Sequence, residues 1–242
     1  MIPYIRRQKI LDYMDGKDVV YLKDIAAFLS RSVSTVRRDL VGLEKEGLVK
    51  LLNGGAATLQ SRSYDLPVEK KRQTNIEAKE IIARKAAELV ENGDVIYIDS
   101  GTTTVMMMKY LKNKKLTIVT SSLTFPREHL TPDIKLIYLG GELLADLESL
   151  VGSITEKQLL SMYFDKAFVG ANGYGEQGVF TYDLREARKK EIVKEQSRIV
   201  YLLADTSKEN KRSFARAFGL DACVLITEKD AGQEAESDTP QG

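Results

Sequence analysis

The first sixty residues carry the hydrophobic spacing of short helices followed by two short strands. Apolar side chains three or four positions apart predict helices over residues 4–15, over 22–29 and from Ser32 onwards. Two apolar runs follow at 48–52 and 56–59, and the asparagine and two glycines between them are typical of a hairpin turn. We therefore expect a small helical domain that ends in a β-hairpin.

The segment that begins at Ser32 (SVSTVRRDL) has the pattern of a helix with one polar face. Val36, Leu40 and Leu43 recur at helical spacing and form a stripe to be buried. Ser32 can act as an N-cap that accepts a hydrogen bond from an amide of the first turn. The side chains that lie mainly off the stripe are Ser34, Thr35, Arg37 and Arg38. With the preceding helix and a tight turn between them, this pattern indicates a helix-turn-helix that reads DNA.

Beyond residue 75 the pattern changes to helices that alternate with compact apolar strands. Helices are predicted over 76–91, 102–112, 153–163 and 185–197. The apolar runs that predict strands lie at 94–100, 116–121, 133–140, 166–171, 198–205 and 222–228. Buried strands alternating with helices favour a mostly parallel sheet covered on both faces, so the expected fold class of this part is α/β.

Length and composition agree with two domains. A chain of 242 residues fits one small and one medium domain. We predict a head at 1–59, a linker at 60–75, a second domain at 76–228 and an acidic, disordered tail at 229–242. The linker assignment rests on polar composition, on Pro67 and on the charge run EKKR, which we interpret as a solvated face.

The distribution of charge bears on how the head would bind DNA. Residues 1–58 hold ten Lys and Arg against seven Asp and Glu, whereas the rest holds 26 against 28. The net charge of +1 therefore hides a mildly basic head. Because the bias is mild, binding to double-stranded DNA is expected to need two or more heads on one duplex, and hence a homo-oligomer.

The small number of cysteines and histidines limits the disulfide and metal chemistry that the chain can carry. Cys223 is the only cysteine and His129 the only histidine, so neither an internal disulfide nor a zinc cluster of the usual spacing is expected. We expect no metal and no cofactor, and interpret Cys223 as a small core residue of a strand. No apolar run approaches the length of a membrane span and the N-terminus lacks the pattern of a secretion signal, so a cytoplasmic protein is expected.

Small and polar residues follow several predicted strands, which is where open α/β sheets bind ligands. In the strongest group, Asp99-Ser100-Gly101-Thr102-Thr103-Thr104, a glycine, hydroxyls and a helix N-terminus are suited to a phosphate. The alternative is ordinary capping between a strand and a helix. The other groups are Thr120 to Ser122, Gly140-Gly141, Gly170 to Gly173, and Asp205 to Lys208. Glu186 and Lys190, four apart on one helix, are most simply an ion pair of about 0.3 kcal/mol.

The motifs also resemble a known family. The matching head residues are Ile25, Ala26, Leu29, Ser32, Thr35, Arg37, Arg38, Asp39, Leu40, Leu43, Gly47, and Gly54 to Ala56. They fall where the DeoR family of bacterial transcription regulators has its N-terminal pattern. That family usually has Arg and His before the paired glycines, where this chain has Lys50 and Asn53. The resemblance implies a winged helix-turn-helix whose DNA-binding residues are Ser32, Ser34, Thr35, Arg37, Arg38, Lys50 and Asn53.

The second domain resembles the C-terminal sensor domain of the same family, which is related to ribose-5-phosphate isomerase folds. The matching residues are Ser100 to Thr103, Thr120, Gly140-Gly141, Gly152, Phe168, Gly170, Gly178, Thr181, Glu186-Ala187, Lys190, Asp205, Ser207 and Lys208. The resemblance implies phosphate binding at Ser100, Gly101, Thr102 and Thr103. It implies contact with a sugar phosphate at Thr120, Gly140, Gly141, Glu186, Lys190, Asp205 and Lys208. Lys189 departs from the family pattern, which usually has an apolar residue before the matched lysine.

These expectations combine into a DNA-binding repressor of a sugar or carbohydrate operon that is controlled by a phosphorylated sugar. An alternative is a sugar-phosphate isomerase-like enzyme with an accessory DNA-binding head. Its proton transfer would need a positioned base, for which Glu186, Asp205 or Asp99 could serve. A structural DNA-binding protein without an effector is a third alternative, but it leaves the polar groups at the strand ends unexplained.

Overall fold

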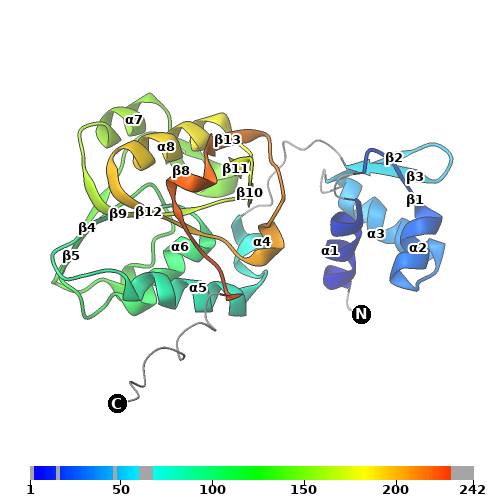
Figure 1. Ribbon diagram of the computed structural model, residues 1–242. Helices are drawn as coiled ribbons and strands as arrows, with labels where there is room; N and C mark the ends of the chain where they lie inside the picture. The colour runs from blue at the N-terminus through cyan, green and yellow to red at the C-terminus, as the bar shows by residue number, and fades with distance from the viewer. Residues whose placement is uncertain (1–2, 15–16, 46–47, 60–67, 230–242) are drawn as a thin grey trace, which may run out of the picture. The chain divides into compact units, whose positions relative to one another are not determined.

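The computed structural model describes residues 3–14, 17–45, 48–59 and 68–229, and the chain divides into two compact units, Met1–Tyr64 and Asp65–Gly242 (Figure 1). The predicted tail lies outside the described residues beyond Lys229. The first half of the predicted linker, 60–67, also lies outside them. Within the second half of that linker, Val68–Arg72 form the short helix α4.

The first unit contains the predicted helices and hairpin. Its helices are α1 (Pro3–Met14), α2 (Leu22–Leu29) and α3 (Val33–Lys45), and its hairpin strands are β2 (Val49–Leu52) and β3 (Ala56–Leu59). A further strand, β1 (Val20–Tyr21), pairs antiparallel with β3 and gives the sheet order β1-β3-β2. The sequence pattern missed β1 because two residues are too few to show a period.

Local backbone geometry accounts for both turns of this unit. Ser30 ends α2 in the left-handed conformation, with φ of 51°, so the chain reverses into α3 within three residues. Gly54 and Gly55 form the hairpin turn with φ of 83° and 74°, which glycine adopts without steric cost. The predicted stripe of α3 is buried as expected: Val36 and Leu40 are 0% exposed and Leu43 is 1% exposed.

A buried ion pair joins α1 to α3. Both oxygens of the Asp39 carboxylate bind the guanidinium of Arg6, and the contact from Nη2 to Oδ1 is 2.9 Å long. The side chains of Arg6 and Asp39 are only 13% and 4% exposed. The pKa of Arg6 is raised because Asp39 accepts its hydrogen bonds, against the opposing effect of burial. A bidentate pair fixes geometry in addition to charge, so it sets how α3 lies against α1.

In the described part of the second unit, six parallel strands form the central sheet in the order β14-β12-β9-β4-β5-β6. These strands are β4 (Val95–Ile98), β5 (Leu116–Thr120), β6 (Ile134–Tyr138), β9 (Phe164–Gly170), β12 (Ser197–Leu203) and β14 (Val224–Ile226). Every pairing between them is parallel, which confirms the predicted sheet.

Helices cover both faces of this sheet (Figure 1). They are α5 (Ile76–Glu88) and α6 (Thr102–Met106) on one side, and α7 (Ser153–Leu159) and α8 (Leu184–Glu195) on the other. Tyr97 packs in the core cluster that includes α7 and α8, whereas its neighbours Ile96 and Ile98 pack with residues of α5. Side chains alternate across a strand, so a sheet buried on both faces reads as a continuous apolar run.

Several expected elements are shorter, and two small sheets were not expected. The predicted helix 102–112 is α6 followed by a 3-10 turn at Met107–Tyr110, and the predicted helix 153–163 ends at Leu159. The additional antiparallel sheets are β7 (Glu142–Leu144) with β8 (Ser149–Val151), and β10 (Gly173–Gly175) with β11 (Gly178–Thr181) and β13 (Ala215–Phe218). Half-buried Cys223 precedes β14 and is not within the strand.

The pKa of Cys223 is raised to about 11 by burial and by Asp221. Its thiol is therefore protonated near neutral pH, in agreement with a packing role. Among the described helices, none is long and apolar enough to cross a membrane.

We expect Asp39→Ala to lower the free energy of unfolding of the first unit by about 3 kcal/mol, because Arg6 is left partly buried without its carboxylate. Hydrogen exchange of the α3 amides in the full chain measures this loss. The matched control is Asp24→Ala, an exposed acid in the first turn of α2, which should cost about 0.5 kcal/mol. Equal α3 protection in wild type and Asp39→Ala would show that the ion pair contributes nothing.

Candidate functional site

Helix α3 presents the predicted DNA-binding side chains at the surface of the first unit. Ser32, Ser34, Arg37 and Arg38 are exposed and Thr35 is half-buried. The amide of Thr35 donates to Ser32 Oγ at 3.3 Å, which confirms the predicted N-cap. Ser32 Oγ also lies 2.9 Å from the hydroxyl of Ser34 and 2.9 Å from that of Thr35. In the hairpin, Lys50 and Asn53 are both exposed.

The second unit contains a cavity of about 60 Å³ at the carboxyl ends of β4 and β9. Its walls come from the loop Ser100–Thr103 after β4, from Gly170 to Asn172 at the end of β9, and from Glu186 and Lys190 on α8. Lys71 of α4 and Lys208 complete the wall. A larger cavity of about 300 Å³ adjoins it, since Val68, Ser100 and Thr102 line both.

Hydrogen bonds from the side chain of Thr104 hold the loop after β4 in place. Thr104 is fully buried, and its hydroxyl lies 2.8 Å from the carbonyl oxygen of Asp99 and 2.7 Å from that of Gly101. A Cβ added at Gly101 would lie 3.2 Å from Thr104 Oγ1 and 3.7 Å from Gly170 Cα, so the glycine allows a close approach of two loops. The amides of the first helical turn of α6 have no partner within the helix and can donate to a bound anion.

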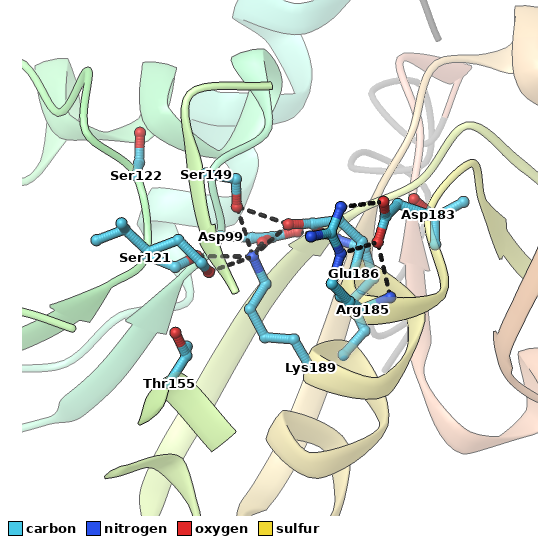
Figure 2. Close-up of polar contacts among 12 residues, drawn as sticks. Asp99, Ser121, Ser122, Ser149, Thr155, Asp183, Arg185, Glu186 and Lys189 are labelled. Carbon is cyan, nitrogen blue, oxygen red and sulfur yellow. Dashed lines mark hydrogen bonds and ion pairs between the residues drawn. The ribbon is translucent and has the colours of Figure 1, made fainter. Parts of the chain in front are cut away.

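Two carboxylates, Asp99 and Glu186, and two lysines, Lys189 and Lys190, are buried at or beside this cavity, and Figure 2 shows Asp99, Glu186 and Lys189. Lys190 Nζ contacts Asp99 Oδ2 and lies 3.5 Å from Glu186 Oε2. Lys189 Nζ donates to Glu186 Oε1 at 2.6 Å and lies 3.7 Å from Asp99 Oδ1. All four side chains are at most 5% exposed. Glu186 and Lys190 are thus a buried pair within a larger set, which corrects the interpretation as a simple i,i+4 pair.

The charges of this set perturb one another. Burial alone would raise the pKa of Asp99, but the ammonium groups of Lys190 and Lys189 and the amide of Gly170 hold it below its ordinary value. Burial alone would lower the pKa of Lys190, but Asp99 and Glu186 raise it. Asp99 and Lys190 are therefore both charged near neutral pH, because each stabilises the charge of the other.

A second polar group joins α5 to the segment after β12. Asn75 Nδ2 donates to Asp205 Oδ1 at 3.0 Å, and Lys208 Nζ donates to the carbonyl oxygen of Ala171 at 2.7 Å. Burial alone would raise the pKa of Asp205, but Lys208, Ser207 and Asn75 lower it. The nearby Lys79 has its pKa lowered to about 8 by burial and by Lys208. These contacts hold Lys208 at the cavity wall.

The structure brings most of the predicted effector residues together. Those that line the cavity are Ser100, Gly101, Thr102, Thr103, Glu186, Lys190 and Lys208. Asp205 is not among the lining residues, since its carboxylate is buried against Asn75 and Ser207.

Thr120, Gly140 and Gly141 do not line this cavity, and their contact with a sugar phosphate stays a prediction. Thr120 is fully buried, and its hydroxyl donates to the carbonyl oxygen of Ile98 at 2.6 Å. Gly141 has φ of 151°, and a Cβ there would lie 2.0 Å from Thr155 Oγ1. The paired glycines therefore allow the end of β6 to pack against α7.

Other residues of the cavity were not among the expected effector contacts. Asp99 and Asn172 belong to the polar groups noted after predicted strands, and both line the cavity. Thr181, a residue of the family pattern, also lines it. Lys71 reaches the cavity from α4, and nothing in its local sequence marks it. Within the described residues, no group of His, Cys, Asp and Glu side chains is arranged to hold a metal ion.

A helix-turn-helix with a hairpin wing, followed by a parallel α/β unit, defines the class of DNA-binding transcription regulators. A model of the DeoR-like helix-turn-helix domain matches residues 6–62, and a model of the DeoR C terminal sensor domain matches residues 74–229. The chain belongs to the DeoR family of transcription regulators.

Relatives match over nearly the whole chain. The uncharacterised HTH-type transcriptional regulator FruR of Bacillus subtilis is 35% identical over 92% of this chain and 89% of its own length. The lactose phosphotransferase system repressor of Streptococcus mutans is 31% identical over 92% of this chain and 91% of its own. Among solved structures, a ribose 5-phosphate isomerase A from Methanocaldococcus jannaschii aligns with a TM-score of 0.41 and 20% identity, over 56% of this chain and 55% of that one.

The pKa of Asp99 predicts how its replacement depends on pH. Because that pKa is lowered in the folded state, ionised Asp99 stabilises the fold above the unfolded value of about 4, and this contribution is lost as the pH falls below it. We expect Asp99→Asn to cost about 3 kcal/mol at neutral pH, since Lys190 stays buried with one carboxylate fewer. The difference from wild type should shrink below about pH 4.

Urea unfolding of both proteins across this pH range measures the difference. The control is Asp133→Asn, an exposed acid before β6, which should change the free energy of unfolding by less than about 0.5 kcal/mol. A cost that is the same at all pH values would contradict the charge-based account of Asp99.

Proposed function

We propose that this protein is a repressor of a sugar-related operon, whose head binds operator DNA and whose second unit binds a phosphorylated sugar that changes DNA binding. The cavity at the end of β4 carries the proposal, because basic side chains, hydroxyls and helix amides meet there in a domain of the sensor family. The S. mutans relative is named as a lactose phosphotransferase system repressor, which supports a sugar-related role.

The DNA-binding part of the proposal rests on α3. Its exposed side chains combine two arginines with hydroxyl groups on the face opposite to the buried stripe. Arginine pairs with guanine in the major groove, and hydroxyls contact bases or phosphates. Lys50 and Asn53 of the hairpin can contact the DNA backbone. A head of this size makes few phosphate contacts, so a homo-oligomer that binds two half-sites would supply the affinity.

The effector part rests on the charges and donors of the cavity wall. Lys190, Lys208 and Lys71 line it, and the loop Ser100–Thr103 adds hydroxyls and amides that donate to phosphate oxygens. The carboxylates of Asp99 and Glu186, beside Lys190, can accept hydrogen bonds from hydroxyl groups, which suits a ligand that carries both phosphate and hydroxyls. The adjoining cavity of about 300 Å³ provides space beyond the phosphate site.

The effector must discriminate between two states of the repressor. A ligand shifts an equilibrium only by its difference in affinity for the two arrangements, so a sugar phosphate that binds both equally would have no effect. Fluorescence anisotropy of the protein on its own promoter DNA, at one salt concentration, with and without a panel of phosphorylated sugars tests the whole proposal. Binding that no compound alters would contradict effector control.

We expect Arg38→Ala to weaken operator binding by about 1–3 kcal/mol if the guanidinium pairs with a base. The physical reason is the loss of a bidentate hydrogen bond in the major groove. Anisotropy titrations at several salt concentrations separate this role from a phosphate contact, whose loss would mainly reduce the salt dependence. Arg198→Ala, which removes an exposed arginine of the second unit, is the control for net charge. Unchanged operator affinity in Arg38→Ala would remove Arg38 from the interface.

We expect Thr102→Glu to abolish the response to a sugar phosphate while leaving DNA binding without effector intact. The new carboxylate would occupy the loop that donates to phosphate and would repel the anion. Operator titrations with and without the effector measure the response. Thr131→Glu places the same charge before β6, away from the cavity lining, and should respond as wild type. A normal response in Thr102→Glu would count against this loop as the phosphate site.

A further inference from the structure

Lys189 is the most deeply buried charged side chain of the set beside the cavity. Its exposed fraction is 0%, and its ammonium does not line the cavity. Nζ donates to Glu186 Oε1 at 2.6 Å, to Ser149 Oγ at 2.7 Å and to Ser121 Oγ at 2.9 Å. Figure 2 shows the ammonium between these groups, which come from three separate elements. A lysine is rarely buried so completely, so its charge must have a partner or a role.

The two carboxylate oxygens of Glu186 have different partners. Oε1 accepts from Lys189 and, at 2.6 Å, from the hydroxyl of Ser149. Oε2 lies 3.5 Å from Lys190 Nζ, and Glu186 lines the cavity. A carboxylate whose one oxygen is held by two donors has a fixed orientation. Its other oxygen keeps capacity to accept a hydrogen bond from a ligand hydroxyl.

The charge balance of the four buried side chains depends on Lys189. Asp99 and Glu186 carry two formal negative charges and Lys190 carries one positive charge, while Lys71 and Lys208 line the cavity outside this buried set. The four side chains together are neutral only when Lys189 is included. Charges interact strongly where water is excluded, so an uncompensated carboxylate near the cavity would oppose a bound phosphate. Lys189 compensates Glu186 from the protein interior without occupying space in the cavity.

We propose that Lys189 is a positioning residue of the effector site, which cancels the charge of Glu186 and aims its second oxygen at a ligand hydroxyl, so that the cavity admits a phosphorylated polyol. The ligand part of this inference rests on the proposed function. The role of Lys189 in the charge balance does not, because it follows from contacts within the protein.

The groups that face Lys189 and Glu186 come from several elements. Helix α8 supplies Lys190, β4 supplies Tyr97, and β8 supplies Ser149, while Asp99 follows β4 and Ser121 follows β5. Lys208 lies on the cavity wall. Burial and the nearby Asp99 raise the pKa of Tyr97, so its hydroxyl stays neutral. Asp99 reports the charge of Lys189, since that ammonium is one of the groups that lower the pKa of Asp99.

The test uses Lys189→Gln and Lys189→Met in the full chain. Glutamine keeps a hydrogen-bond donor without the charge, and methionine keeps the apolar stem alone. In the first measurement, carbon-13 NMR follows the carboxyl of Asp99 without any ligand. We expect Asp99 to titrate at higher pH in both variants than in wild type. An unchanged titration of Asp99 in Lys189→Gln would overturn the proposal. Because this test needs only Lys189→Gln, it can still be made if Lys189→Met does not fold.

The second measurement is calorimetric titration with ribose 5-phosphate and with inorganic phosphate at about pH 8. We expect Lys189→Gln to bind ribose 5-phosphate about tenfold more weakly than wild type, because a carboxylate beside the cavity loses its compensating charge. Equal affinity of wild type and Lys189→Gln for ribose 5-phosphate would overturn the proposal.

Recognition of a hydroxyl predicts a further difference between the two probes. Ser149→Ala leaves all charges in place and removes one donor to Glu186 Oε1, so it should weaken ribose 5-phosphate and leave inorganic phosphate unchanged. An equal loss for both probes would contradict the aiming role. If wild type binds neither probe, the proposed function fails for this ligand class, and the titration of Asp99 still decides the role of Lys189 in the charge balance.

Discussion

Two carboxylates can lie buried beside the cavity of the second unit because two lysines of one helix are buried with them. Removing an ion from water costs several kcal/mol even after relaxation, so a solitary Asp99 would take up a proton or draw in water. Lys190 and Lys189 prevent this, and their contacts join the end of β4 to α8 across 91 and 90 positions of the chain. The cavity keeps a defined shape because this pairing tolerates few alternative arrangements.

The parallel sheet brings these groups to one edge. Strands β4 and β9 are neighbours, so the loop Ser100–Thr103 and the segment Gly170 to Asn172 emerge side by side. Apolar side chains on both faces hold the strands rigidly, and the residues that follow the strands are free to carry polar chemistry. Thr104 braces the first of these loops through carbonyl oxygens, so the donors of the loop are positioned before any ligand arrives.

In the head, the functional side chains lie on an exposed helix face and not in a cavity. Its helix α3 buries one stripe and leaves arginines and hydroxyls exposed on the other face, as a surface for DNA requires. The pair Arg6–Asp39 holds this helix against α1 from the buried side. In the second unit, α4 lines the cavity and is the described element nearest in sequence to the head.

The sequence by itself determined the helix-turn-helix, its N-cap and the six parallel strands, because helical and strand periods are local properties of the chain. Val36, Leu40 and Leu43 mark a buried stripe wherever the helix lies. Only the tertiary structure decided which strand ends meet. Thr120 and the paired glycines at 140 and 141 lie at the ends of predicted strands, as Ser100 to Thr103 do, but the fold places Thr120 in a buried hydrogen bond to Ile98 and Gly141 close to Thr155 of α7.

The sequence pattern did not predict the antiparallel strands β7, β8, β10, β11 and β13, because segments of three or four residues show no reliable period. Lys189 illustrates the same limit for chemistry. Its neighbours in sequence are charged, and nothing local distinguishes it from a surface lysine of α8. Its role depends on Ser149 of β8, on Asp99 after β4 and on Ser121 after β5, which the fold brings to it from distant parts of the chain. Burial of a charge is decided by the whole structure and not by any one segment.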